Sequence, residues 1–585
     1  MSLDIARLVA FSGISATELQ ISLASSNISN ADTTGYTRKS ANQVADVTAG
    51  IGTGVSITGI SSNVDKLLLK SLIAANSELG SADATNNYLE QLQQLFGSAS
   101  TSGTSTGGTS LANSLASLES ALSSLASSPS SVSLQSAVVS ALDDFASQLR
   151  GTSSSVQTLR ANADKDIASS VESVNDDLQQ IADLNVEIRK LAASGQSTAD
   201  LEDQRNAALQ DLSSYMNVSY YSASNGDLQV YTSSGRALVD SSVHVLSYTA
   251  SANVSASSSY GSGGFSGIMV DGVDVTSQIT SGKIGALVTL RDQTLPAVQS
   301  QLDQLASQLA SALNETTNGA SAVPPPNNLT GTTATSGVAS LSASGTVRIA
   351  VADQSGNLVS YQDLDLSSYA TVGDLVTALN GISGVSASVD SAGHLSISAT
   401  SSSYGVAIND MSSAIGGAGF SDYFGMNDLV TGTGAADFAV RSSILSGDAG
   451  LPTGSLDGST TLTTGSQVLT SGSATIINAL YDRLTGATSF SSAGGLSATT
   501  GSFADYAAAI VANVASKASQ ASSAYTTKST AQSTYASSLS SQSGVNIDEE
   551  TARLSALQNK YAAASQVISV VNSMFSSLLS AVQSS

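Results

Sequence analysis

The sequence predicts a multidomain α+β protein, in which a terminal α-helical coiled coil and a helical core domain carry two inserted mostly-β domains. Two observations lead to this fold class. Apolar residues repeat in heptads at both ends of the chain, as they do in coiled-coil strands. Between the ends, the apolar period changes twice from helical to alternating and back, which indicates β domains inserted into loops of a helical core. Both termini are then expected at one end of the molecule.

The two terminal heptad stripes are the strongest assembly signals in the sequence. The N-terminal stripe contains Phe11, Ile14, Ile21, Ala24 and Ile28, and the C-terminal stripe contains Leu554, Leu557, Tyr561, Ala564, Ile568, Val571, Phe575, Leu578 and Val582. Such stripes are often the core of an ordinary bundle, but their regularity, length and terminal position favour contacts between copies. Ordering a helix costs about 1–2 kcal/mol per residue in backbone entropy, which burial of one thin stripe does not offset. We therefore expect the ends to order on assembly.

The N-terminal region is predicted to contain a helix, a loop, a strand and a second helix. The first helix should end near Ser29, because the segment SNADTTGYTRKS that begins there is rich in turn-forming residues. In GIGTGVSITGI, glycines precede an alternating apolar pattern, which predicts a strand entered through a turn. The second helix is expected over residues 64–96.

A long helical region follows. The polar stretch SASTSGTSTGGTS is interpreted as a flexible linker, and helical periods resume over residues 111–125 and 134–191. Ser197 and Asp200 form a capping-box signature for a further helix that ends near Met216.

The first β segment begins at Val218, where the apolar period becomes alternating. The dipeptide Asn225-Gly226 between two alternating runs is a strong hairpin signal. The segment is expected to last until about Thr280, after which a helix of roughly 25 residues returns the chain to the helical region.

The second β segment follows the sequence PPPNN, which marks a boundary. Alternation covers about residues 330–470 and includes a short helix that Thr371 and Asp374 are expected to cap. Helical patterns resume at about Ala474 and continue towards Gln542.

These patterns predict four domains. They are a terminal coiled-coil domain (residues 1–45 and 545–585), a helical core domain (46–216, 281–321 and 472–544), a small β domain (217–280) and an outer β domain (322–471).

Composition argues against several classes of function. The chain has 45 acidic and 21 basic residues and a net charge of -24, and no Lys/Arg cluster of the kind that nucleic-acid binding needs. It has no Cys and only two His, which argues against disulfides and most zinc or haem sites. The N-terminus does not resemble a cleaved signal peptide. No apolar run approaches about 18 residues, so membrane insertion is not expected.

No catalytic, cofactor-binding or metal-ligating residue is predicted. The glycines of GIGTGV precede a strand, whereas a dinucleotide fingerprint lies between a strand and a helix. His244 and His394 are expected to be outward-facing strand residues. The acidic run after Asn546 suits the start of a helix that Asn546 caps, with Glu549 reaching back. The chain is therefore not expected to be an enzyme.

Two motifs, one near each end, resemble a known family. In SSNISNADTTGYTRKS the residues that carry the resemblance are Asn27, Ile28, Asn30, Gly35, Tyr36 and Arg38, and in SGVNIDEETARL they are Gly544, Asn546, Asp548, Glu549 and Glu550. Both motifs resemble bacterial flagellar axial proteins, and the second is most similar to the flagellar hook-associated protein 1 family. Weaker similarity covers LEDQRNAALQDLS, a segment from SGKIGALVTL onward, and GDLVTALNGISGV. The segment QNKYAA departs from the family, which more often has glutamine at Lys560 and Ala562.

The resemblance implies a structural subunit without cofactors that polymerises as the junction layer joining hook to filament. Its terminal helices would line an inner tube, and its β domains would face outwards. The implied partners are neighbouring copies of the chain, hook protein, hook-associated protein 3 and a flagellar export chaperone. The implied location is the extracellular flagellum, reached by type III export without a cleaved signal. The alternatives are another axial protein, such as hook-associated protein 3 or flagellin, and a secreted adhesin.

Overall fold

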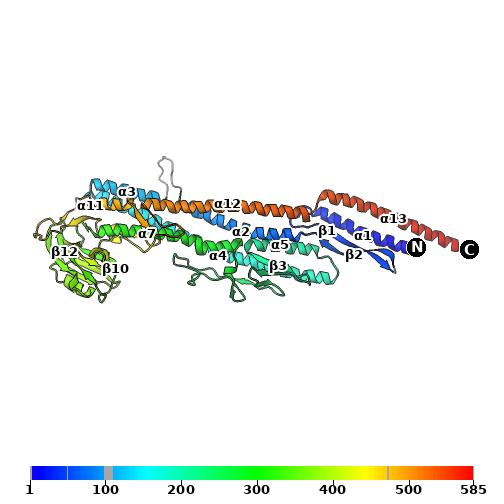
Figure 1. Ribbon diagram of the computed structural model, residues 1–585, viewed down its shortest axis with the longest axis horizontal. Coiled ribbons are helices and arrows are strands. Elements are labelled where there is room, and N and C mark those ends of the chain that lie inside the picture. Colours follow the sequence, from blue (N-terminus) through cyan, green and yellow to red (C-terminus); the bar gives the residue numbers. More distant parts are fainter. Residues whose placement is uncertain (1–2, 49, 98–109, 471–472, 584–585) are drawn as a thin grey trace.

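The computed structural model describes residues 3–48, 50–97, 110–470 and 473–583. The molecule is elongated, with both termini at one end and a β-rich unit at the other (Figure 1). Long helices connect the two ends, and the strands form several small sheets, which confirms the multidomain α+β fold class. The predicted polar linker lies almost entirely outside the described residues.

The terminal region consists of two long helices and a hairpin. Its elements are α1 (Leu3–Ser29), β1 (Lys39–Thr48), β2 (Ile51–Ser62) and α13 (Ile547–Gln583). α1 packs along α13 and ends at Ser29, as predicted, while the antiparallel β1 and β2 pack against α1. The sequence pattern does not predict β1, because its large apolar side chains, Val44 and Val47, are exposed and three residues apart. Alternation is visible only where one face of a strand is buried.

The helical core spans most of the length of the molecule (Figure 1). Its helices are α2 (Lys66–Leu95), α3 (Leu111–Ser127), α4 (Val132–Ala193), α5 (Ala199–Tyr215), α6 (Gly282–Thr289), α7 (Leu295–Asn318), α11 (Thr475–Thr485) and α12 (Phe503–Ser543). One hydrophobic cluster runs through these helices and into the small β region. α12 packs along α2, and α4 packs against both α3 and α5. The predicted helices of this region are therefore confirmed, with three differences.

The first difference is the start of α5, where the predicted capping box is wrong. The N-cap residue is Thr198, whose hydroxyl donates to Glu202 Oε1 (2.8 Å). Ser197 accepts only a long hydrogen bond (3.4 Å) from the backbone of Ala199. Asp200 instead lies 3.7 Å from the ammonium group of Lys39, so an ion pair across the fold replaces the local cap.

The second difference is the helix that follows the small β region. It is longer than the predicted 25 residues because α6 and α7 are joined through a π-helical turn, Leu290–Thr294. Arg291 of this turn is fully buried, with Nη1 2.9 Å from Asp164 Oδ1 of α4. The extra residue of a π turn lets this side chain point inwards without ending the helix.

The third difference is a hairpin inside the last predicted helical stretch. β22 (Thr488–Phe490) and β23 (Thr499–Gly501) separate α11 from α12. Phe490 is buried and stacks on Tyr506 of α12, with ring centroids 4.1 Å apart. This aromatic contact anchors the hairpin to the core.

The small β region lies beside α4 and contains short strands. They are β3 (Val218–Ser222), β4 (Leu228–Thr232), β5 (Ala237–Val239), β6 (Leu246–Ser247), β7 (Met269–Val270) and β8 (Val273–Asp274), followed by a 3-10 turn (Thr276–Gln278). β3 and β4 form the predicted antiparallel hairpin, with Gly226 at positive φ in the turn.

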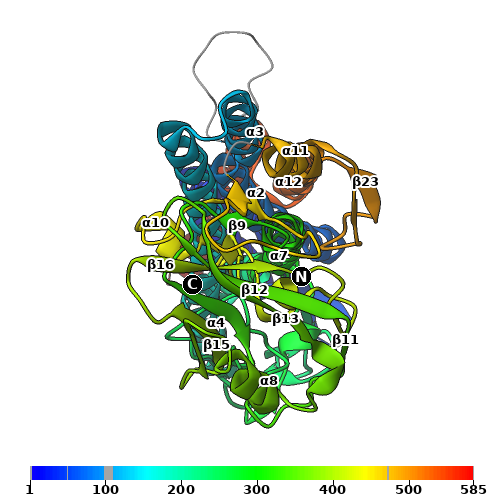
Figure 2. The same ribbon diagram turned by 90° about the vertical axis from the view of Figure 1, so that its left-hand side faces the viewer.

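The outer β region forms the end of the molecule that faces the viewer in Figure 2. Its strands are β9 (Ser321–Ala322), β10 (Asn328–Ala334), β11 (Ala343–Ser344), β12 (Thr346–Asp353), β13 (Leu358–Asp365), β14 (Val385–Val389), β15 (His394–Ala399), β16 (Tyr404–Asn409), β17 (Ala414–Ile415), β18 (Val430–Thr431), β19 (Ala439–Val440), β20 (Pro452–Leu456) and β21 (Leu469–Thr470). Its helical segments are a 3-10 turn (Leu366–Ser368), α8 (Val372–Leu379), α9 (Phe420–Phe424) and α10 (Ser442–Leu445). β12 pairs antiparallel with β13 and β16, and Thr371 and Asp374 form the predicted capping box of α8. The division into four domains remains a prediction.

Candidate assembly site at the joined termini

The two family-like motifs meet where the terminal helices join the core. Asn27 of α1 is fully buried there, and each end of its amide contacts a different segment. Its Oδ1 accepts hydrogen bonds from the backbone N–H of Lys39 and from the hydroxyl of Tyr36, both at 3.0 Å. Its Nδ2 donates to the carbonyl of Lys39 (3.0 Å) and to Glu550 Oε2 (3.4 Å). We call the cluster of Asn27, Tyr36, Arg38, Lys39, Asp203 and Glu550 the joint.

Glu550 brings the start of α13 into the joint. Its side chain is fully buried, and Oε1 lies 2.6 Å from Arg38 Nε and 3.7 Å from Arg553 Nη1. The neighbouring Glu549 is largely exposed and places a carboxylate oxygen 3.0 Å from Arg38 Nη2. A buried carboxylate is stable only when paired and hydrogen-bonded, so Arg38 and Asn27 hold α13 at this position.

Lys39 and Thr37 connect the joint to the helical core. Lys39 is buried, and its ammonium group pairs with Asp203 of α5 and donates to the carbonyl of Ala199 (2.8 Å). Asp203 also accepts hydrogen bonds from the Thr37 backbone (2.9 Å) and hydroxyl (2.7 Å). Asp203 belongs to the segment LEDQRN, so a third region of family similarity enters the same cluster.

The break between α12 and α13 lies at the joint as well. The carbonyl of Ser543 accepts from the backbone of Arg38 (2.8 Å), and its hydroxyl accepts from the backbone of Asp65 (3.0 Å). Asn546 caps α13 as predicted, because its Oδ1 accepts from the backbones of Asp548 (3.0 Å) and Glu549 (3.2 Å). The predicted return contact from Glu549 is replaced by its ion pair with Arg38.

Tyr36 completes the joint. Its ring lies 5.0 Å from the Lys39 ammonium, and burial raises the pKa of its hydroxyl, which therefore stays a hydrogen-bond donor to Asn27. Gly35 has a φ of +78°, which a non-glycine residue adopts only at a cost.

The motif residues differ in burial, and the structure brings most of them together. Asn27 and Glu550 are buried, Asn30, Tyr36, Arg38 and Gly544 are half-buried, and Gly35, Asn546, Asp548 and Glu549 are exposed. Lys39 and Asp203 were not among the predicted site residues. The similarity of LEDQRN was a signal for Asp203, but its partner lies 164 residues away in sequence.

The predicted seam residues line the contact between α1 and α13 only in part. Leu557 and Val571 are buried, whereas Ile14, Ile21, Ile28, Leu554, Tyr561, Ala564, Ile568 and Phe575 are half-buried, and Phe11 and Leu578 are exposed. Val582, the last residue of the predicted stripe, is exposed as well, and so is a second apolar row on α13 that contains Val567, Val570, Met574 and Leu579. The role of these residues as a seam between copies remains a prediction.

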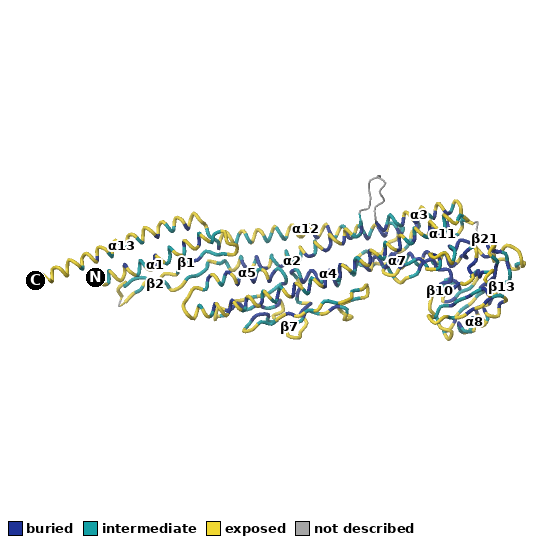
Figure 3. The backbone as a smooth tube through the Cα atoms, turned by 180° about the vertical axis from the view of Figure 1, so that it is seen from behind, coloured by how far each residue is buried: buried dark blue, intermediate teal, exposed yellow. Residues whose placement is uncertain are grey.

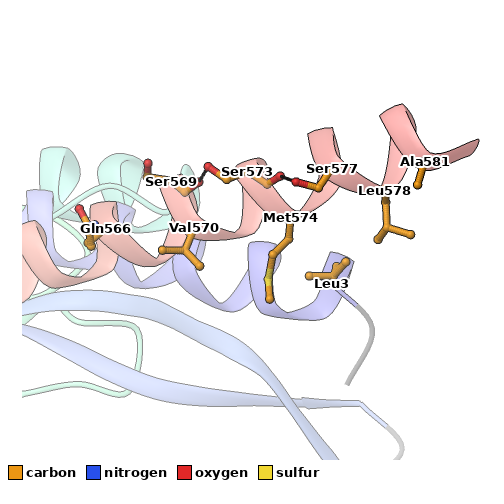
Figure 4. A pocket seen from close by; sticks show the side chains of 9 residues that line it. All are labelled: Leu3, Gln566, Ser569, Val570, Ser573, Met574, Ser577, Leu578 and Ala581. Carbon is orange, nitrogen blue, oxygen red and sulfur yellow. Dashed lines mark hydrogen bonds between the residues drawn. The ribbon is translucent and has the colours of Figure 1, made fainter. Parts of the chain in front are cut away.

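Part of the exposed surface of α13 forms an open groove of about 820 Å³ with the start of α1. Figure 4 shows Val570, Met574 and Leu578 of α13 on one side, near Leu3 of α1. No charged residue follows Lys560 in the sequence, so this half of α13 is apolar and uncharged. Contiguous exposed apolar surface in soluble proteins is often a contact surface for a partner, and this groove is a candidate for one.

The apolar, uncharged second half of α13 also affects the expectation that no segment of the chain could insert into a membrane. Within Phe503–Gln583, one stretch is long and apolar enough by length and composition to cross a membrane, and only 6% of it is buried. The expectation was based on unbroken apolar runs, whereas α13 reaches this hydropathy through Ala, Val and Leu interspersed with Ser. Length and composition alone do not distinguish a membrane helix from a helix that packs against partners.

No metal site is found in the described parts of the chain, where no cluster of three or more His, Cys, Asp or Glu side chains could hold an ion. His394 begins β15, as expected, and lies 3.3 Å from Asp390. His244 lies between β5 and β6 instead of within a strand, and its Nδ1 is 2.7 Å from Asp271 Oδ2.

Comparison with family models matches four regions. Residues 76–322 match the model described as the flagellar hook-associated protein FlgK helical domain. Residues 8–37 match flagella basal body rod protein, residues 536–581 match the C-terminal model of flagellar basal body rod FlgEFG protein, and residues 346–401 match the flagellin hook IN motif. The first three matches meet at the joint.

Two curated relatives are each called flagellar hook-associated protein 1. The protein from Escherichia coli is 24% identical over 317 residues, and the protein from Salmonella typhimurium is 24% identical over 313 residues. Each match covers 52% of this chain and 55% of the relative, so the chain spans about half the length of the curated relatives it matches.

A solved structure, the flagellar hook junction protein FlgK from Burkholderia pseudomallei, is also similar. The match has a TM-score of 0.47 and 18% identity, and it covers 80% of this chain and 98% of that chain. The matches to its core and both ends, together with its curated relatives, show that the chain is similar to flagellar hook-associated proteins.

Proposed function

We propose that this chain is a structural subunit of the bacterial flagellum that polymerises as the junction layer joining hook to filament. The observation that carries the proposal is the joint, where both family motifs and α5 of the core are connected through buried ion pairs. The joint fixes the direction in which the terminal helices leave the core. The apolar face of α13 beyond it is uncovered and would be covered by neighbouring copies.

The terminal helices order on assembly in this proposal. The free ends of α1 and α13 are largely exposed (Figure 3). In α13 only two apolar residues, Leu557 and Val571, are buried. Their contacts within one chain offset little of the entropy lost on helix formation. Neighbouring subunits supply the remaining contacts, so that α1 and α13 form the inner tube.

The proposed partners are neighbouring copies of the chain, hook protein below and hook-associated protein 3 above. Before export, a flagellar chaperone covers the exposed row of α13. Export occurs through the flagellar type III apparatus without a cleaved signal peptide, and the final location is the extracellular flagellum. The role is structural and includes no catalytic step.

Deletion of the gene in the source bacterium tests this function. The deletion strain should form hooks without filaments and release flagellin into the medium, and electron microscopy with analysis of the medium measures both. Normal filaments in that strain would refute a junction role. Antibody labelling of purified flagella separates the alternatives, because a flagellin-like protein would label the whole filament and an adhesin would be absent from the hook end.

A further inference from the structure

A basic cleft lies beside the joint, between β2, α2, α5 and β3. It has a volume of about 1060 Å³ and is lined by Lys66, Lys70 and Arg205, together with residues such as Ala74 and Tyr221. The chain has 21 basic residues against 45 acidic ones, so three cations at one cleft are notable in this protein. We call this surface the basic cleft.

Arg205 lies in the wall of the basic cleft and is incompletely paired. Its side chain is 7% exposed, and its Nη1 donates to Asn185 Oδ1 (2.8 Å) and to the carbonyl of Gly226 (2.9 Å). Its buried Nε has no hydrogen-bond partner among the described residues. A buried N–H group without an acceptor is unfavourable, so this part of the cleft wall favours negative charge nearby.

Lys66 and Lys70 occupy positions where a positive charge destabilises the start of α2. They lie four residues apart on one face of α2, where like charges repel, and in its first turns, where the helix dipole disfavours cations. Both are exposed, and no described residue forms an ion pair with either. The two carboxylates of the cleft are already engaged, Glu78 with Lys528 (3.0 Å) and Glu202 with Thr198 (2.8 Å). An acidic ligand in the cleft would reduce the repulsion between Lys66 and Lys70 and offset their unfavourable interaction with the helix dipole.

A complementary acidic surface lies on α4 of the same chain. Glu172, Asp176, Asp183 and Glu187 are exposed, and their spacing of four, seven and four residues places them on one face of the helix. We call these four residues the acidic ridge. Lys165 and Lys190 bound it at either end.

The acidic ridge and the basic cleft lie at the same level along the molecule. Arg205 in the cleft is hydrogen-bonded to Asn185, which lies on α4 between the last two acids of the ridge. No described residue of α4 lines the cleft, so the acidic ridge and the basic cleft are separate surfaces. Complementary patches on different sides of one subunit form head-to-tail contacts, which close into rings or extend into helical arrays.

We propose that the basic cleft of one copy receives the acidic ridge of α4 from a second copy of this chain. The inference rests on the proposed function, in which copies pack side by side. Carboxylates of the ridge would pair with Lys66 and Lys70, and Arg205 would add positive charge at the cleft wall. The contact adds a lateral interface in the core to the one made by the terminal helices.

Disulfide cross-linking tests the contact without background, because the natural chain has no Cys. Ala74 lies in the cleft, and Gln180 is exposed between acids of the ridge. The double variant Ala74→Cys/Gln180→Cys is introduced into the deletion strain, and purified flagella are oxidised. We expect a ladder of disulfide-linked oligomers that disappears on reduction.

The matched control is Ala74→Cys/Thr158→Cys. Thr158 is exposed on the same face of α4, about 20 Å before the ridge at 1.5 Å per residue. It should give at least several-fold less cross-linking. Equal cross-linking in both variants, or none in flagella that contain the chain, would overturn the basic cleft as the contact. Absence of the chain from the flagella would instead overturn the proposed function, and this inference with it.

Charge exchange gives a second test. Lys66→Glu/Lys70→Glu should reduce the amount of chain in purified flagella several-fold, while the thermal stability of the purified chain should not fall, because both side chains are exposed and acidic residues suit the start of a helix. Adding Glu172→Lys/Asp176→Lys should restore incorporation. Unchanged incorporation of the first variant, or no rescue by the second, would contradict the proposed pairing.

Discussion

The joint and the tips lie at opposite ends of the helix pair α1 and α13, and they differ in how their side chains are contacted. Polar side chains at the joint have partners within the chain, whereas apolar side chains at the tips remain exposed. At the joint, Asn27 and Glu550 are fully buried, and their polar atoms find partners within the chain. Towards the tip, Met574 and Leu578 of α13 are each 53% exposed. Buried polar groups need hydrogen-bond partners, and at the joint they find them within one subunit. The exposed apolar groups of the tips remain available for contacts with other subunits.

This difference separates two tasks. Hydrogen bonds and ion pairs are directional, so the joint can fix the angle at which the helices leave the core. Apolar burial is non-directional and additive, so the tips can gain stability from several neighbours at once. The following experiments change one region and leave the other intact.

The largest effect is expected from charges at two exposed apolar residues of α13, Met574 of the second row and Leu578 of the predicted seam. In Met574→Asp/Leu578→Asp, filaments should be lost completely, because two carboxylates would have to be buried between copies. Unfolding of the purified chain should not change. Val338→Asp is the control, since Val338 is 88% exposed in the outer β region. Filament-bearing cells counted by electron microscopy give the readout, and normal filaments in the double variant would contradict an assembly role for these two residues.

The next effect concerns proteolysis of the dilute monomer. If the ends order only on assembly, protease should remove about residues 1–45 and 545–585 many times faster than it cuts the core. Mass spectrometry of the resistant fragment identifies the boundaries. In assembled flagella the same segments should be protected. Protease-resistant ends in the monomer would show that the joint alone orders the helices.

A smaller, local effect is expected at the joint itself. Glu550→Ala removes the buried partner of the half-buried Arg38 and one acceptor of the buried Asn27 amide, and should weaken docking of α13 by about 1–3 kcal/mol. The control Glu549→Ala removes a largely exposed carboxylate, which contributes at most about 1 kcal/mol. Hydrogen exchange at residues 27–39 and 543–553 measures the docking. Equal protection in both variants would mean that the Glu550 pair does not hold the joint.

The smallest effect concerns Asp177 of α4, a carboxylate that, unlike Glu550, is not paired with any basic residue that the structure describes. Burial, together with Asp211 and Asp176, raises the pKa of Asp177 to about 7, and its buried Oδ2 has no partner among the described residues. Because this pKa is above the unfolded value of about 3.9, the folded state binds more protons, so stability should fall as pH rises from about 4 to 7.

Replacing Asp177 tests that pH dependence. Asp177→Asn should flatten it and raise stability at pH 8 by on the order of 1–2 kcal/mol, allowing for solvent screening of a half-buried group. The control Glu187→Gln, at an exposed residue of the same helix, should change stability by less than about 0.5 kcal/mol. Denaturant unfolding at several pH values measures both. A pH profile unchanged by Asp177→Asn would mean that solvent satisfies this carboxylate.

Periodicity predicted the long elements of the fold but not those whose cause lies elsewhere in the chain. The ends of α1, α2 and α5 agree with the sequence to within a few residues. β1 was not predicted because its apolar side chains are exposed, and the hairpin at 488–501 depends on the contact between Phe490 and Tyr506. The capping box at Ser197 failed because Asp200 faces Lys39 instead.

The candidate site divides in the same way. The motif residues Asn27, Arg38 and Glu550 could be named from the sequence, because their resemblance to a family is local. Lys39 and Asp203 could not, since the ion pair between them joins residues 164 positions apart. Nor does a heptad show which of its residues will be covered, since Phe11 and Leu578 fit the stripe and are exposed in the single chain.

The sequence by itself determined the helical and alternating segments and placed assembly signals at both ends, because 3.6-residue and two-residue periods are properties of local geometry. Only the tertiary structure decided that both motifs close on one buried cluster with α5, and that the second face of α13 stays open. Burial and pairing depend on which distant segments share space, and a one-dimensional pattern contains that information only where the contacts are local.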